Sequence, residues 1–421
     1  MNPYELIILV SITLILSYVS SLIYEKTKIP DIVWLIFLGI LVGPVLNIFN
    51  KKVFVSLSHL MSIIALSVFL FDAGLDINIK TLLKQMGKAS VLSITTIISV
   101  ILVVGVFLSR LLPNSFNLLE GMLLGSMIAG TSTVSVFGIL SQLSKNIDDI
   151  GNTQTMLMIE SVLSDPICIM LSIMFLRMVM EPDTSILISL RKLVIVLVFS
   201  SLLGIFSGMV WANILTPIRG RPYSYMVTLA VLLPLFAVAE KVIGKGGGAM
   251  VAITFGLALS NFDYFANLIN FERDVLVPLN DIREFHGEIT FFVKSFFFVY
   301  IGLIVTLSLQ YTLIGLGIVT LIMCVRFLVV TGISKAMSFT VEEEILSKVV
   351  YASGLPAFVM SQLPLIYDPN AEYFSNPRLY PDLAMPIVLG IVIVNALAGS
   401  SLAKEKIEEE NNTLENATEE E

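Results

Sequence analysis

The side chains most able to do chemistry in this chain are two acids and two bases that stand inside long apolar stretches. Glu160 and Asp165 lie in one stretch, and Lys294 and Arg326 lie in two others. An ionised group at the centre of a bilayer costs at least ~2.5–3.5 kcal/mol, so such residues face protein or water and have partners. Carboxylates also bind protons and alkali cations, which makes these residues the first candidates for a site.

The spacing of the polar residues around Glu160 separates the two acids. At about 100° per residue, Ser161 and Asp165 share one helix face, and Glu160 and Ser164 share another. The two acids are then about 140° apart, so they need not meet the same partner. Pro166 cannot donate a backbone hydrogen bond, which frees a carbonyl near Asp165. The pattern favours ion binding at Asp165, with Ser161 and Ser164 as further oxygen ligands.

Glu160 has a simpler interpretation as a structural acid. A buried carboxylate needs a base on another helix, and the two bases inside apolar stretches, Lys294 and Arg326, are both available. We therefore expect a structural or coupling ion pair between Glu160 and one of them. The same structural interpretation is the alternative to ion binding for Asp165.

Two clusters of glycine, hydroxyl and proline residues predict interruptions in their helices. Gly130, Thr131 and Ser132 form the first cluster, and Gly354 and Pro356 mark the second. Such residues weaken a helix and supply oxygen ligands, and irregular backbone at membrane depth is tolerated only where it faces protein or a cavity. Each cluster alone could instead be a seam where small residues let helices pack closely.

The elements that must position these residues are membrane-spanning helices. The 421 residues are 56% hydrophobic and 14% charged, with a mean hydropathy of +0.91, whereas soluble domains carry about 25% charged residues. The sequence therefore predicts an all-α polytopic membrane protein. The predicted spans cover residues 4–24, 31–48, 53–77, 88–112, 117–141, 152–180, 188–213, 223–240, 246–261, 288–307, 310–337, 344–366 and 382–403. The stretch 262–287 is expected to connect two spans.

Thirteen spans allow two inverted repeats of six, with the seventh span as the link. The two predicted helix interruptions then fall in the fifth and the twelfth span, which occupy corresponding places in the two halves. Paired broken helices in matching positions indicate a transporter with a binding site at the membrane midplane. We expect residues 1–403 to form this membrane transporter domain.

The distribution of basic residues predicts the orientation. Of the 25 Lys and Arg residues, fourteen fall in loops on the side of the C-terminus, nine on the other side and two inside spans. This bias places the C-terminus in the cytoplasm of a cell-membrane protein. Residues 404–421 hold eight Glu and two Lys, which predicts a disordered acidic tail and argues against a nucleic-acid partner.

Several other classes of protein lack the residues they need. Residues 244–248 read GKGGG, without the spacing of a phosphate loop, so no nucleotide partner is expected. The two histidines, His59 and His286, form no metalloprotease motif. We therefore expect neither an enzyme nor a cofactor.

Five stretches resemble the monovalent cation:proton antiporters, specifically the archaeal and bacterial branch of the sodium/proton exchangers. Residues 160–166, ESVLSDP, are similar to the core motif Glu-Ser-x-x-Asn-Asp-Pro of that family. The other similar stretches are residues 28–31, 38–44, 71–76 and 292–303, and Arg326 falls where this branch keeps an arginine. The resemblance covers all thirteen spans and leaves out only the acidic tail.

The resemblance implies a thirteen-span fold, a homodimer, and a moving core with crossed broken helices. It also implies that Asp165 binds a proton and a monovalent cation in competition, and that Glu160 pairs with Lys294. The chain departs from the family at Ser132, where a carboxylate is usual, and at Ser164, where Asn is usual.

A secondary active antiporter of H⁺ against a monovalent cation is therefore the expected function. Na⁺ is the first choice of ion, K⁺ or Li⁺ are possible, and a single carboxylate favours electroneutral exchange. The ion is expected to contact Asp165 with help from Thr131, Ser132 and Ser161. The alternative is a sodium-driven symporter of a small organic solute with the same architecture.

Overall fold

The chain is described by a computed structural model that covers most of its length. The described residues are 3–27, 31–46, 51–131, 136, 151–181, 186–218, 225–244, 246–268, 277–304, 308–351 and 353–395. All regular secondary structure in these ranges is helical, which confirms the predicted all-α class. Two compact units divide the chain: Met1–Tyr18, Trp34–Lys84 and Leu176–Val305 form the first, and Val19–Val33, Gln85–Phe175 and Thr306–Glu421 form the second.

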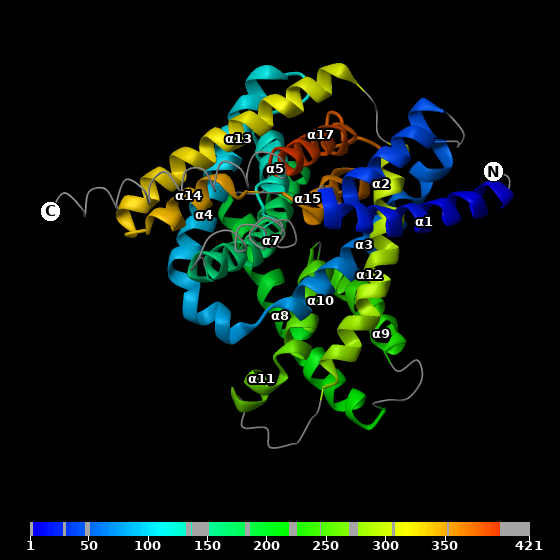
Figure 1. Cartoon of the computed structure of the whole chain (residues 1–421), viewed down its shortest axis with the longest axis vertical. Helices are drawn as coiled ribbons and strands as arrows, with labels where there is room; N and C mark the ends of the chain where they lie inside the picture. Colours follow the sequence, from blue (N-terminus) through cyan, green and yellow to red (C-terminus); the bar gives the residue numbers. More distant parts are fainter. Residues whose placement is uncertain are drawn as a thin grey trace. The chain divides into compact units, whose positions relative to one another are not determined.

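The first unit is built around α10, a helix of small and apolar residues that is buried along almost its whole length. Its helices are the first part of α1 (Pro3–Thr27), most of α2 (Asp31–Ile40), η1 (Leu41–Val45), α3 (Lys51–Asp76), α8 (Ile186–Leu215), η2 (Thr216–Ile218), α9 (Met226–Val242), α10 (Gly247–Ser260), α11 (Phe262–Leu268) and α12 (Leu279–Ile304). α10 packs against α8, α3 and α9, and α12 runs along α3 (Figure 1). α11 turns away from α10 by 87°.

The second unit holds the residues that the sequence marks for chemistry, apart from Lys294. Its helices are most of α4 (Ile79–Leu111), α5 (Leu118–Ile128), most of α7 (Gly151–Met180), α13 (Leu309–Ala336), α14 (Val341–Val349), α15 (Leu355–Ser361), α16 (Leu363–Tyr367) and α17 (Leu379–Val394). α17 packs against α13, α15 and α5 (Figure 1). Most residues of α17 are buried, and its last two residues, Ile393 and Val394, are exposed.

The predicted spans agree with these helices in place but not always in length. Each of the thirteen predicted ranges overlaps a helix of the described structure. Four described helices are long and apolar enough to cross a membrane, and α10 with α11 forms a bent fifth candidate. This number is smaller than thirteen partly because the range 344–366 is divided into α14, α15 and α16, none of which is long enough to cross a membrane alone. The count of thirteen spans and the inverted repeats therefore stay predictions.

Candidate functional site

The two acids of interest lie on α7, which runs without interruption through Pro166. Glu160, Ser161 and Ser164 are buried, whereas Asp165 is half-buried. Because α7 is a regular helix here, the two acids face different surroundings, as their spacing in the sequence requires.

The helix that precedes α7 in the described chain stops in the interior of the second unit. α5 begins with a capping box formed by Asn117 and Glu120 and ends at Ile128. The three residues that follow, 129–131, are buried but not helical. Gly130 and Thr131 therefore lie in the non-helical backbone that follows α5. Ser132 is outside the described residues.

A second interruption separates α14 from α15. α14 ends at Val349, and the chain is extended at Val350 and at Gly354, the N-cap of α15. Pro356 lies in the first turn of α15, where its missing N–H has no helical partner to lose. Gly354 and Pro356 thus mark the restart of a helix rather than a bend within one.

The two interrupted segments meet and share hydrogen bonds. The Tyr351 hydroxyl donates to the Ala129 carbonyl at 2.7 Å, and the Ser353 hydroxyl donates to the Ile128 carbonyl at 2.6 Å. The last carbonyls of a helix have no partner within it. Here Tyr351 and Ser353 from the second interruption donate hydrogen bonds to carbonyls at the end of α5. These bonds offset the cost of burying non-helical backbone.

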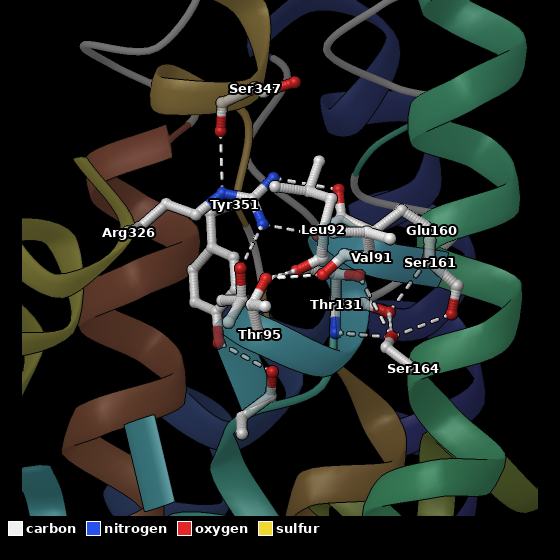
Figure 2. Close-up of polar contacts among 12 residues, drawn as sticks. Val91, Leu92, Thr95, Thr131, Glu160, Ser161, Ser164, Arg326, Ser347 and Tyr351 are labelled. Atoms are coloured by element: carbon white, nitrogen blue, oxygen red, sulfur yellow. Dashed lines mark hydrogen bonds and ion pairs between the residues drawn. The ribbon is translucent and has the colours of Figure 1, made fainter. Parts of the chain in front are cut away.

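Residues 128–131, Tyr351 and Ser353, where the two interrupted segments meet, are called the crossing below. Thr131 connects the crossing to α7 through its backbone. Its N–H donates to Ser164 Oγ at 3.0 Å, and its carbonyl accepts from Ser161 Oγ at 2.9 Å (Figure 2). The Ser164 hydroxyl lies 2.8 Å from the Ser161 carbonyl and 3.0 Å from Thr131 Oγ1. Ser161, Ser164 and Thr131 therefore form one hydrogen-bonded group.

Asp165 lies beside this group at the end of α5. A Cβ atom added to Gly130 would come within 3.2 Å of Asp165 Oδ1, so the carboxylate reaches the backbone of the crossing. The described part of the chain gives this carboxylate neither a hydrogen bond nor an ion pair. It holds no cluster of three or more His, Cys, Asp or Glu residues that could bind a metal ion either. Any cation at Asp165 would depend on a single carboxylate from the described residues.

Glu160 is held by Arg326 of α13. The two guanidinium nitrogens Nη1 and Nη2 meet the two carboxylate oxygens, with Nη2 2.8 Å from Oε2 (Figure 2). Arg326 also donates to the Ser347 carbonyl at 2.7 Å and to Thr96 Oγ1 at 3.1 Å. Both charged side chains are buried, so this bidentate pair satisfies two groups that would be costly alone.

The sequence left Lys294 and Arg326 open as partners of Glu160, and the resemblance implied Lys294; the described structure pairs Glu160 with Arg326. Arg326 takes the place of that base because its planar fork can bond both carboxylate oxygens and two further acceptors at once. Lys294 belongs to α12 in the first unit, where it lies within electrostatic range of Asp72.

The sequence pattern assigned no role to three side chains at the crossing. Tyr351 and Ser353 donate to the end of α5, and Asn395 bonds the backbone of Tyr351. A signal existed for the first two, because both precede Gly354 within the predicted interruption. Asn395 carries no such signal, since it follows an apolar run like many polar residues at helix ends.

Comparison with known proteins defines the class. The family model described as "Sodium/hydrogen exchanger, transmembrane" matches residues 10–404. A solved structure of the sodium proton antiporter MjNhaP1 from Methanocaldococcus jannaschii at pH 8 is 19% identical, with a TM-score of 0.78 over 96% of this chain and 99% of that one. The family and the fold are those of transporters, not of enzymes. The chain belongs to the sodium/hydrogen exchanger family, as its motifs indicated.

Curated relatives are similarly distant in sequence. A protein named probable Na(+)/H(+) antiporter 2 of Methanocaldococcus jannaschii is 23% identical over 310 residues, 71% of each chain. The K(+)/H(+) antiporter NhaP2 of Shewanella sp. strain ANA-3 is 26% identical over 271 residues, 62% of this chain and 44% of that protein. The K(+)/H(+) antiporter NhaP of Alkalimonas amylolytica is 24% identical over 57% of this chain and 41% of that protein. The chain thus spans less than half the length of these two K(+)/H(+) antiporters.

Proposed function

We propose that this protein is a secondary active antiporter that exchanges protons for a monovalent cation. Na⁺ is the first candidate for the cation, with K⁺ or Li⁺ as alternatives. Membership of the sodium/hydrogen exchanger family supports this assignment, and relatives named as Na(+)/H(+) and K(+)/H(+) antiporters leave the cation open. The single observation that carries the proposal is the Asp165 carboxylate, which reaches the crossing of two interrupted helices without a basic partner in the described chain.

The mechanism is competition for one negative site. A lone carboxylate at membrane depth is costly while it is charged and empty. A proton or a cation that has lost its water neutralises it equally well, but the two cannot occupy it together. If the core of the protein moves only when the site is neutral, each crossing of a cation must be matched by the return of a proton.

Further oxygen ligands for the cation are assigned to the residues around Asp165. The candidates are Thr131, Ser132 and Ser161, with Ser164 in a supporting position. The Ser164 hydroxyl already accepts from the Thr131 N–H and lies within bonding distance of the Ser161 carbonyl, so its first effect is to hold the others in place. The Glu160–Arg326 pair lies on another face of α7 than Asp165, about 140° away around the helix, and is assigned no ligand role.

The wider architecture belongs to the same proposal. We assign thirteen spans to residues 1–403, arranged as two inverted six-helix repeats whose broken helices cross, and an acidic cytoplasmic tail to residues 404–421. The protein would be a homodimer in the cell membrane, surrounded by lipid, with electroneutral exchange. The MjNhaP1 fold, matched over 96% of the chain, supports an arrangement of this kind.

Proteoliposomes with an internal pH dye test the function directly. Addition of Na⁺, K⁺ or Li⁺ outside should drive proton efflux from vesicles that hold the wild-type protein. The Asp165→Asn variant should lose this response while it still reaches the membrane in normal amounts. Asp263→Asn removes an exposed carboxylate on α11 and should respond like the wild type. Full exchange by Asp165→Asn would refute the assignment, and a response only in the presence of an organic solute would favour the sodium-driven symporter.

A further inference from the structure

Tyr351, in the non-helical backbone after α14, is held by Asn395 at the end of α17. Asn395 Oδ1 accepts from the Tyr351 N–H at 2.9 Å, and Asn395 Nδ2 donates to the Tyr351 carbonyl. The amide thus pairs with both backbone groups of one residue, as a neighbouring strand would do. Asn395 is buried and also donates to the Ile391 carbonyl in its own helix at 3.0 Å.

Tyr351 also contacts the end of α5 through its side chain. Its hydroxyl donates to the Ala129 carbonyl at 2.7 Å, and its ring lies against the Arg326 guanidinium, 5.3 Å from the ring centre. Ala129 is followed at once by Gly130, which faces Asp165, and by Thr131, whose carbonyl and N–H bond Ser161 and Ser164. Hydrogen bonds from Asn395 to Tyr351 and from Tyr351 to Ala129, continued by the backbone of residues 129–131, therefore connect the end of α17 to the ligands proposed for the cation.

We propose that Asn395 and Tyr351 are positioning residues for ion exchange. The Asn395 amide holds the backbone of Tyr351 in place, and the Tyr351 hydroxyl then fixes the backbone of residues 129–131 at the distance from Asp165 that suits the cation. This inference rests on the proposed exchange at Asp165 and adds residues that touch neither the cation nor the proton.

The chemistry of the two side chains argues for this role over simple packing. A leucine at position 395 has the same branching of heavy atoms as asparagine, and a phenylalanine at position 351 keeps the ring of tyrosine. Both positions instead carry a group that bonds a main-chain atom freed by a helix interruption. A buried backbone group left without a partner costs free energy, so the segment would shift to find a new one.

Two variants test the proposal. Tyr351→Phe removes one hydrogen bond and keeps the ring against Arg326, and Asn395→Leu removes the clamp on the backbone. We expect Tyr351→Phe to raise the apparent KM for the exchanged cation about three- to tenfold, the effect of one lost hydrogen bond. The maximal rate should change less, and the ratio of the responses to Na⁺, K⁺ and Li⁺ should shift. Asn395→Leu should produce the same changes to a greater extent.

Matched controls separate positioning from general damage. Among the described residues, the Thr320 hydroxyl bonds only the Leu316 carbonyl of its own helix and the Asn213 amide only the Met209 carbonyl; Thr320→Val and Asn213→Leu remove these two groups. Both should leave the apparent KM and the order of cations unchanged. Asn395→Asp keeps the acceptor for the Tyr351 N–H and loses the donor, so it should fall between the wild type and Asn395→Leu if it folds.

The outcomes distinguish this proposal from the function on which it rests. If Tyr351→Phe melts normally and exchanges with unchanged apparent KM and cation order, the positioning role is refuted. If Asn395→Leu fails to fold, Tyr351→Phe alone decides, because it keeps the clamp. If the wild type shows no exchange, or Asp165→Asn retains it, the function itself falls. Cation-dependent thermal stabilisation of wild type and Tyr351→Phe then still reports whether the hydroxyl affects binding, and equal stabilisation would refute that effect.

Discussion

Gly130 shows at the level of one residue how closely the site is packed. A methyl group on this residue would lie 3.2 Å from Asp165 Oδ1 and 3.4 Å from Cys168 Sγ. The first distance is shorter than an ordinary carbon–oxygen contact, so the carboxylate would have to move. Because Gly130 is the neighbour of Thr131, such a move would change the distance between the carboxylate and the proposed ligands.

We therefore expect Gly130→Ala to weaken cation binding. The apparent KM for the cation should rise about tenfold or more, since a displacement of a few tenths of an ångström affects every ligand of a rigid site. Cation titrations of exchange in proteoliposomes measure this. Gly317→Ala is the matched control, because its methyl group would only touch Phe107 at 3.9 Å. An unchanged KM in Gly130→Ala would show that Asp165 binds the cation away from this glycine.

We assign the buried Glu160–Arg326 pair a structural role. Removal of one member of a buried pair leaves an uncompensated charge and typically costs ~3–5 kcal/mol. Arg326→Ala should therefore lower the melting temperature markedly, because the Glu160 carboxylate would lose both of its hydrogen bonds to the guanidinium. Lys192→Ala breaks an exposed pair with Glu181 and should cost ~0–1 kcal/mol. Thermal unfolding of purified protein in detergent compares the two variants, and equal stability would contradict the structural role.

At the level of elements, glycines decide how closely α3 and α10 can approach. A Cβ on Gly256 would lie 2.3 Å from the Phe71 carbonyl oxygen, and one on Gly74 would lie 2.1 Å from the Ile253 carbonyl oxygen. No side chain fits at such distances, so the two backbones must separate if either glycine is replaced. The central helix of the first unit thus owes its place to small residues, as in other close helix pairs in membranes.

Gly256→Ala should destabilise the first unit for this reason. Overpacking at a contact made of rigid backbone costs ~1–3 kcal/mol or more, which exceeds the gain in helix propensity of ~1 kcal/mol. Gly332→Ala in α13 gains the same propensity and meets nothing within 4 Å, so it should be neutral or stabilising. Melting temperatures of the two variants test this difference. A Gly256→Ala protein as stable as the wild type would show that α3 and α10 are further apart.

The sequence predicts elements better than it predicts partners. Apolar length and punctuation by Gly and Pro place every predicted range on a helix, and they place Gly130 and Gly354 outside helices. These features are local, because a glycine weakens a helix whatever surrounds it. The bend of α11 and the division of the range 344–366 into three helices depend on packing and were not predicted.

Partners depend on which helices become neighbours. Lys294 and Arg326 carry the same charge in similar apolar stretches, and only the packing of α13 in the second unit selects Arg326 for Glu160. Asn395 is 44 residues from Tyr351 in the chain, so its pairing with that backbone cannot be read from local pattern. Ser164 could be identified as part of the site, but its bond to the Thr131 N–H could not.

At the level of the whole molecule, the number of carboxylates at the crossing bears on the charge moved per cycle. Asp165 is the acid that reaches the crossing in the described residues, and Glu160 is already neutralised by Arg326. Position 132, where a carboxylate is usual in the sodium/hydrogen exchanger family, is a serine. One negative charge that is balanced by either one proton or one cation gives a carrier of equal charge in both directions.

Exchange should therefore be electroneutral, because each monovalent cation that crosses is replaced by one proton. Proteoliposomes adsorbed to a solid-supported membrane should give no current after a jump in cation concentration beyond that of Asp165→Asn vesicles. The same preparation must acidify or alkalinise its lumen when measured with the pH dye, which shows that exchange is under way. A current that the Asp165→Asn protein lacks would require more than one proton per cation, and so a second titratable group in the transport cycle beyond Asp165.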